Sequence, residues 1–150
     1  MKPVPTLSSA FLHPACDQLP EPLVALRKQR ASALVDMPLP TRKTENWKYS
    51  AKYLKLSDDM AISLPADGKT GNSLAVPGYK VVFVNGVMIP EASEFPDLDG
   101  IRIESFRDLN GDDATDLSKK LGSTLDHDQA QFARLNGARF EDGLLIRLKP

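Results

Sequence analysis

The spacing of apolar residues predicts a helix in the first third of the chain. Between residues 21 and 36 these residues recur at helical intervals, and Pro22 falls in the first turn, where a missing N–H costs little. We expect Lys28 and Arg30 to point toward water, although Arg30 interrupts the apolar face. The residues expected on that face are Leu23, Leu26, Ala33, Leu34 and Met37.

A second helix is predicted within and after residues 39–50, LPTRKTENWKYS. The Leu39-Pro40 pair favours an extended approach, because a residue that precedes proline is biased away from helix. Thr41 is a candidate N-cap, and Glu45 would place a negative charge in the first turn, where the helix dipole favours it. One helical face would then carry Trp47, Ala51 and Leu54. The two predicted helices, joined by a proline hinge, would form an N-terminal helical hairpin.

The middle and the end of the chain show the patterns of short strands. Residues 79–89 contain two β-rich runs around Asn85-Gly86, the strongest short-range signal for a hairpin. Apolar residues also alternate with charged ones in residues 101–105, and Leu144, Ile146 and Leu148 alternate near the end. Residues 61–64 are a weaker strand candidate, and residues 66–78 read as a mobile polar loop.

Two further short helices are expected between these strands. One would begin at Asp113 or Thr115 and continue to Leu121, with Gly122 as its stop. The other would follow a cap at Asp126 or Asp128 and end at Gly137, before a turn over residues 140–143. Its apolar positions would be Ala130, Phe132, Ala133 and Leu135. The predicted fold class is therefore α+β, with a helical hairpin, a small antiparallel sheet and short helices.

Composition narrows the classes of function. The 150 residues include 19 basic and 20 acidic side chains, so a net charge of −1 provides no field to attract nucleic acid. The single cysteine excludes an internal disulfide and fits a reducing compartment. No apolar run approaches the roughly 20 residues of a membrane helix, and prolines interrupt the start of the chain. We expect a cytoplasmic protein that binds neither nucleic acid nor membrane.

The sequence contains no pattern typical of an active site. Neither form of glycine-rich phosphate loop is present. His13 and Cys16 form a pair of potential metal ligands, and His127 lies between Asp126 and Asp128, but a metal site usually needs three or four ligands. We therefore expect no catalysis, no cofactor and no metal on this chain.

The Trp47 segment has two interpretations, which the residues alone leave open. Trp47 is the only tryptophan, and in a structural role it would anchor the core beneath a solvated rim of Arg42, Lys43 and Lys48. In a binding role the same four residues would recognise a peptide, a nucleotide or a partner protein.

Three runs of this sequence resemble SufD-like proteins of the SufB/SufD family, which are scaffolds of iron–sulfur cluster assembly. Residues 39–50 are similar to the signature LPTR-x-x-E-x-WKYT, with Ser50 at a position where Thr is usual. Residues 83–86 match F-V-(N/D)-G. Residues 135–143, LNGARFEDG, match LN-x-A-x-F-x-D-G, with Gly137 at a position more often filled by a small or polar residue.

The resemblance implies a scaffold role without catalysis, in a complex with a SufB-like paralogue and a SufC-like ATPase. The family's cluster-related residues lie beyond residue 150, so none is carried onto this chain. The resemblance also implies a helical segment over residues 1–56, a small α+β region over 57–143 and, at 144–150, the first strand of a parallel β-helix. We therefore expect the chain to be the N-terminal part of a longer protein, because strand 144–148 would otherwise be an exposed apolar edge. The alternative is a free-standing protein- or ligand-binding module that uses the Trp47 face.

Overall fold

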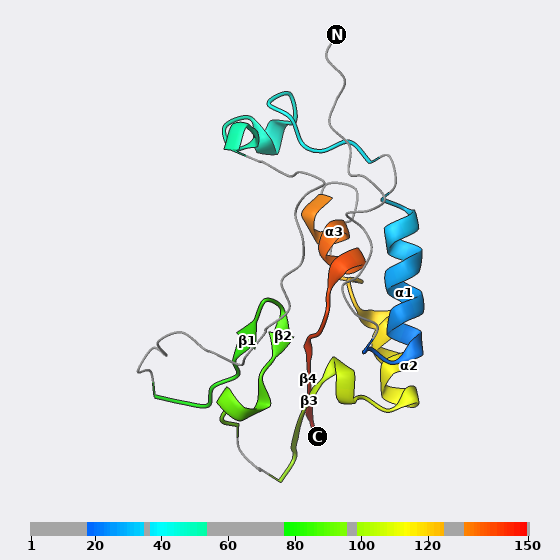
Figure 1. Cartoon of the computed structure of the whole chain (residues 1–150), viewed down its shortest axis with the longest axis vertical. Helices are drawn as coiled ribbons and strands as arrows, with labels where there is room; N and C mark the ends of the chain where they lie inside the picture. The colour runs from blue at the N-terminus through cyan, green and yellow to red at the C-terminus, as the bar shows by residue number, and fades with distance from the viewer. Residues whose placement is uncertain (1–17, 35–36, 54–76, 96–98, 125–130, 150) are drawn as a thin grey trace.

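The computed structural model describes residues 18–34, 37–53, 77–95, 99–124 and 131–149. In these ranges α-helices pack beside two separate two-stranded antiparallel sheets, which confirms the α+β class (Figure 1). The helices are α1 (Glu21–Ser32), α2 (Gly111–Lys120) and α3 (Gln131–Arg139). The strands are β1 (Phe83–Val84), β2 (Val87–Met88), β3 (Ile101–Ser105) and β4 (Leu144–Leu148). The short 3-10 helices are η2 (Glu45–Trp47), η3 (Ala51–Tyr53), η4 (Pro90–Ala92) and η5 (Phe106–Asp108).

Helix α1 begins where the sequence predicts, with Pro22 in its first turn. It ends at Ser32, earlier than predicted, and residues 35–36 lie outside the described ranges. Leu23 and Leu34 are buried and Lys28 is exposed, as expected. The prediction that Arg30 points toward water is wrong, because its guanidinium donates a hydrogen bond to the Leu121 carbonyl and packs between helices.

The predicted second helix, and with it the helical hairpin, is wrong. Residues 45–53 form the two 3-10 helices η2 and η3 with a turn between them. The Thr41 hydroxyl accepts from the Lys43 N–H at 3.2 Å, while the Thr41 N–H donates to the Thr44 hydroxyl at 3.1 Å. Such local bonds offer the backbone an alternative to α-helix. Leu54, the last position of the predicted face, lies outside the described residues.

The β1–β2 hairpin is confirmed, with Phe83 opposite Met88 and Val84 opposite Val87. Asn85 and Gly86 have φ values of 51° and 82°, which is the pair of positive angles that a type I′ turn requires. The weaker strand candidate at 61–64, and residues 66–76 of the predicted loop, fall outside the described ranges.

Strands β3 and β4 have the predicted bounds and pair antiparallel, with Ile103 opposite Ile146. Directly opposed residues of an antiparallel pair share a face. One face therefore presents Arg102 and Arg147, which both reach Asp113 of α2, at 2.8 and 2.5 Å. The opposite face is apolar; Ile146 and Leu148 of β4 are exposed there, and Ile101 and Ile103 of β3 are half-buried.

Acid is expected to weaken the link between α2 and this sheet. Desolvation opposes ionisation of Asp113, but Arg147 and Arg102, together with the hydrogen bond from Asn110, hold the pKa of its carboxyl below the ordinary 3.8. The stability that this carboxylate contributes is present above pH 3.8 and is lost as the pH falls through the lower folded-state pKa. We expect urea midpoints measured between about pH 5 and pH 2 to fall less steeply for Asp113→Asn than for the wild type. Asp116→Asn, on the exposed side of the same helix, should keep the wild-type slope; equal slopes for all three proteins would contradict this assignment.

Helix α2 begins at Gly111, before the predicted start, because Asn110 caps it. The Asn110 Oδ1 accepts from the Asp113 N–H at 2.9 Å. Gly122 follows the helix with a φ of 78°, as a stop residue should. The candidate caps of α3 at residues 126 and 128 lie outside the described ranges.

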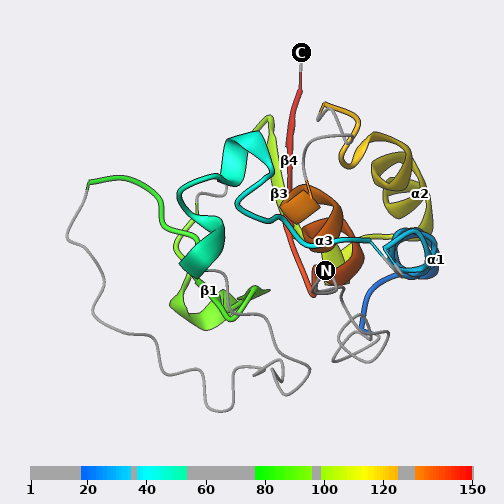
Figure 2. The same cartoon turned by 90° about the horizontal axis from the view of Figure 1, so that it is seen from above.

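The prediction that Gly137 ends α3 is wrong, since the helix continues to Arg139. A Cβ atom at Gly137 would lie 2.7 Å from the Arg30 Nη1. Gly137 thus lies inside α3, where the Arg30 side chain of α1 packs against it. Helices α1 and α3 lie side by side (Figure 2).

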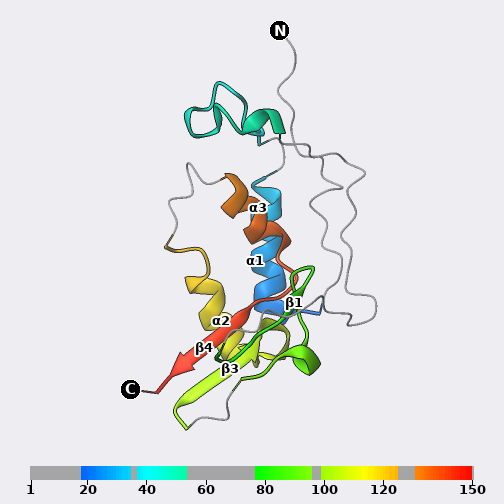
Figure 3. The same cartoon turned by 90° about the vertical axis from the view of Figure 1, so that its left-hand side faces the viewer.

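The core lies where α1, α2 and the segment after α3 meet (Figure 3). The Phe106 and Phe140 rings meet edge to face, with centroids 6.1 Å apart. A Cβ atom at Gly143 would lie 2.2 Å from the Phe106 ring, so this position admits only glycine without movement of the core. The buried cluster comprises Leu19, Leu23, Val24, Phe106, Leu109, Ala114 and Phe140. A second, smaller cluster comprises Leu34, Leu39 and Ala138.

No helix in the described ranges is long and apolar enough to cross a membrane.

Candidate functional site

Asp142 joins three segments of the chain at the end of the 135–143 run. Its Oδ2 accepts from the Met88 N–H of β2 at 3.0 Å. Its Oδ1 accepts from the Ser105 hydroxyl and from the Gly143 N–H, both at 2.7 Å. Because Asp142 is buried, these bonds replace its hydration and hold the β1–β2 hairpin against the segment that leads into β4.

The preceding residue, Glu141, forms a buried ion pair with Arg27 of α1. The Arg27 Nη1 lies 3.5 Å from the Glu141 Oε2, and the side chains are 1% and 4% exposed. The same Nη1 donates to the Phe140 carbonyl at 3.1 Å, and the Arg107 Nε donates to the Glu141 carbonyl at 3.2 Å. The 140–143 segment is thus held by α1, by β2 and by the end of β3.

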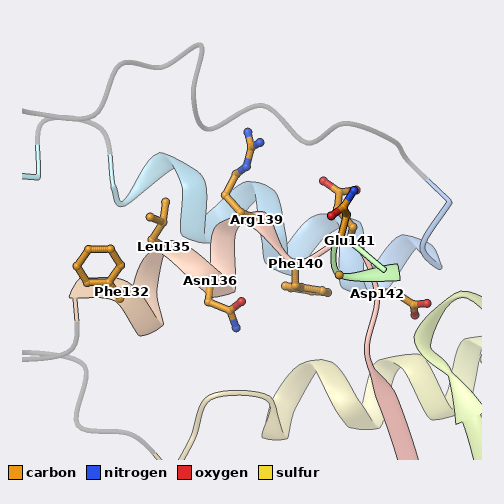
Figure 4. Close-up of a pocket in the computed structure, with 9 residues that line it drawn as sticks. Phe132, Leu135, Asn136, Arg139, Phe140, Glu141 and Asp142 are labelled. Atoms are coloured by element: carbon orange, nitrogen blue, oxygen red, sulfur yellow. The ribbon is translucent and has the colours of Figure 1, made fainter. Parts of the chain in front are cut away.

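A cavity of about 440 Å³ lies between the hairpin turn and this segment (Figure 4). It falls within the range of about 300–1,000 Å³ that is common for ligand sites. Phe132, Leu135 and Phe140 provide apolar walls, and Asn136 contributes a polar side chain from α3. The complete lining consists of residues 85–86, Phe132, Leu135, Asn136 and residues 139–142.

The two carboxylates in this lining already have partners within the protein. Glu141 pairs with Arg27, and both oxygens of Asp142 accept hydrogen bonds. Burial lowers the pKa of the Arg139 guanidinium below its ordinary value, the Glu141 carboxylate opposes this shift and Arg27 adds to it. The cavity therefore contains the partly desolvated Arg139 guanidinium. Its two carboxylates, of Glu141 and Asp142, are already bound by other groups of the protein.

Trp47 does not line this cavity but packs on Phe132, which does. The two ring centroids are 5.0 Å apart and the rings are inclined by 34°. Trp47 is half-buried and belongs to neither buried core cluster. The ring thus covers one wall residue of the cavity and keeps part of its surface in solvent.

The other residues proposed for binding lie on the surface around Trp47. Arg42, Lys43 and Lys48 are exposed, as the predicted rim requires. The Lys48 Nζ lies 5.5 Å from the centroid of Tyr49, a ring that is itself 79% exposed. No described contact joins the three cations to one another, so they share a segment rather than a geometrically defined site.

The residues that build this site were only partly visible in the sequence. Arg27 follows Leu23 by four residues, so the helical period already placed it on the buried face of α1. For Asp142 the sequence predicts a turn, and no local signal indicates its contact with β2. The contact of Trp47 with Phe132 spans more than eighty residues and had no local signal.

Metal chemistry finds no support in the described ranges. No group of three His, Cys, Asp or Glu side chains there could hold an ion. The earlier candidates, His13 with Cys16 and His127 with its two neighbouring aspartates, lie outside those ranges.

Comparisons of the chain with protein-family models, with curated proteins and with solved structures found no match.

Proposed function

We propose that this chain acts as the N-terminal region of a SufD-like scaffold protein in iron–sulfur cluster assembly. The observation that carries the proposal is that the three runs of the resemblance meet around one cavity. Asn85 and Gly86 of the second run line it together with residues 135–136 and 139–142 of the third, and Trp47 of the first packs on Phe132. If the three runs resembled the family only by chance, there would be no reason for them to lie around the same cavity.

The positions that carry the resemblance also have strict structural tasks, which supports a shared fold. Asn85-Gly86 adopts two positive φ angles, and Ala138 is completely buried. Asp142 joins three segments, and Gly143 has no room for a side chain. A family signature is expected at positions where few residue types fit.

In this proposal the chain is a non-catalytic, cytoplasmic component that works with a SufB-like paralogue and a SufC-like ATPase. The chain itself holds no cofactor, and β4 is the first strand of a parallel β-helix that continues beyond residue 150. The antiparallel pair of β3 and β4, with its exposed apolar face, would then be covered by the following strands.

Co-purification from the native source tests this proposal. The protein, tagged in its own gene and purified at low salt, should bring down a SufB-like and a SufC-like protein in constant ratio, identified by mass spectrometry. An untagged strain provides the control. Recovery of the tagged protein without either partner would count against the scaffold role.

A second candidate is a binding module that uses the Trp47 face. It is favoured by the half-buried Trp47, the exposed rings of Tyr49 and Tyr53, and the adjoining cavity. Trp47 is the only tryptophan, so its fluorescence reports this face alone. An emission spectrum that every ligand and partner leaves unchanged would remove this candidate.

A further inference from the structure

The surface beside the cavity has a strong excess of positive charge. The segment of residues 37–53 carries four cations and one carboxylate, Glu45. Arg42 and Lys43 make no ion pair within the described part of the chain, and the ammonium groups of Lys48 and Lys52 lie over tyrosine rings. Helix α3 adds Arg134 and Arg139 and contains no acidic residue. Figure 1 shows this segment beyond the N-terminal end of α3, away from the two sheets.

The cavity adds apolar area to this charged surface. Phe132, Leu135 and Phe140 line it from one side of α3 and the segment that follows. The exposed hairpin turn at Asn85 forms another edge. An apolar depression with polar groups at its rim is the arrangement that accepts an anchor side chain of a bound segment.

We propose that the cavity beside Trp47 is the docking site for an acidic segment of a partner protein that carries an apolar anchor. The anchor side chain packs between Phe132 and Leu135 in the cavity. The acidic residues that flank the anchor lie along Arg42, Lys43 and Lys48. Charge complementarity determines the occupant, because the carboxylates of the cavity have partners inside the protein, while Arg42 and Lys43 make no ion pair with any described residue.

A protein segment fits this surface better than a nucleic acid. Residues 37–53 carry four cations and one carboxylate whereas the whole chain has a net charge of −1, so the residues outside this segment are net acidic. A polyanion longer than the basic segment would extend over residues of net negative charge, whereas a short acidic peptide would not.

This inference rests on the second candidate function, the Trp47 binding face, whose partner class it names. It does not depend on the scaffold assignment, which the co-purification experiment tests separately.

Fluorescence titration of the purified 150-residue chain tests the inference. The probe is a fluorescein-labelled peptide of Glu and Asp residues around a central Leu-Phe pair, and its anisotropy is followed. Titration with the same peptide without its label should also shift the Trp47 emission. We expect saturable binding that weakens with salt. Replacing the Leu-Phe pair with Ser-Ser, or the acidic residues with lysine, should abolish it.

Variants of the chain localise the site. Charge reversal of Arg42, Lys43 and Lys48 together should weaken binding by at least about tenfold, and Phe132→Ala should do the same. Lys120→Glu, an exposed cation of α2, is the matched control and should bind as the wild type does. Circular dichroism confirms that each variant is folded.

Three results would overturn the inference. The first is no binding of the acidic peptide, and the second is equal binding by the charge-reversed variant. The third is tighter binding of a single-stranded uridine oligonucleotide. If the lysine peptide alone shifts the Trp47 emission, the acidic partner is wrong but the binding face remains. If no probe shifts it, the second candidate function loses its support as well.

Discussion

Replacing Arg27 with alanine is expected to lower the free energy of unfolding by about 3–5 kcal/mol. Arg27 is almost completely buried, and its guanidinium contacts both the Glu141 carboxylate and the Phe140 carbonyl. The change would leave a buried carboxylate without its main counter-charge and would open a cavity in α1. Urea denaturation at neutral pH, followed by circular dichroism, measures the loss.

Two further variants separate the charge from the packing. Lys28→Ala, the exposed neighbour on the same helix, should change stability by no more than about 0.5 kcal/mol. The double variant Arg27→Met, Glu141→Leu removes both charges, keeps most of the volume and should recover much of the lost stability. If Arg27→Ala costs no more than Lys28→Ala, Arg27 does not hold the 140–143 segment in place.

Replacing Asp142 with alanine is expected to cost about 3–5 kcal/mol. Three donors lose their acceptor at once, and two of them are backbone N–H groups, of Met88 and Gly143. Each unsatisfied buried donor costs roughly 1–3 kcal/mol. Asp142→Asn retains one acceptor oxygen and should cost less than Asp142→Ala. Thermal or urea unfolding of the two variants measures both losses of stability and so tests this order.

The matched control for this change is Asp99→Ala. Asp99 is 98% exposed and its ion-pair partner in the described ranges is the exposed Lys149, so its loss should be close to neutral. Amide hydrogen exchange adds a local measure, because Asp142→Ala should release protection at Met88 first. Unchanged exchange at Met88, together with a small loss of stability, would show that the hairpin is held in another way.

Much of the secondary structure was predictable from local signals. Asn85-Gly86 adopts the two positive φ angles of its turn, and Pro22 marks the first turn of α1. The alternation in residues 101–105 and 144–148 predicted the bounds of β3 and β4. These features depend on a residue's own backbone preferences or on a short period, so neighbouring residues are sufficient to predict them.

The failed predictions concern residues whose role depends on distant contacts. The prediction of a stop at Gly137 relied on a local signal, whereas the glycine lies inside α3 with the Arg30 side chain of α1 packed against it. Arg30 was expected to face water, yet its guanidinium donates to the Leu121 carbonyl, more than ninety residues later in the chain. The helix expected at Trp47 is replaced by 3-10 turns, and the ring is held by Phe132 instead of a helical neighbour.

The sequence by itself therefore determined the α+β class, the hairpin turn, the strand bounds, the start of α1 and the resemblance of three separate runs. Only the tertiary structure brought those runs together around one cavity and showed that Asp142 and Glu141 hold it in place. The physical reason is the distance along the sequence over which each kind of interaction acts. Backbone preference and periodicity act over a few residues, whereas burial of charge and the packing of rings depend on segments that meet only after the chain has folded.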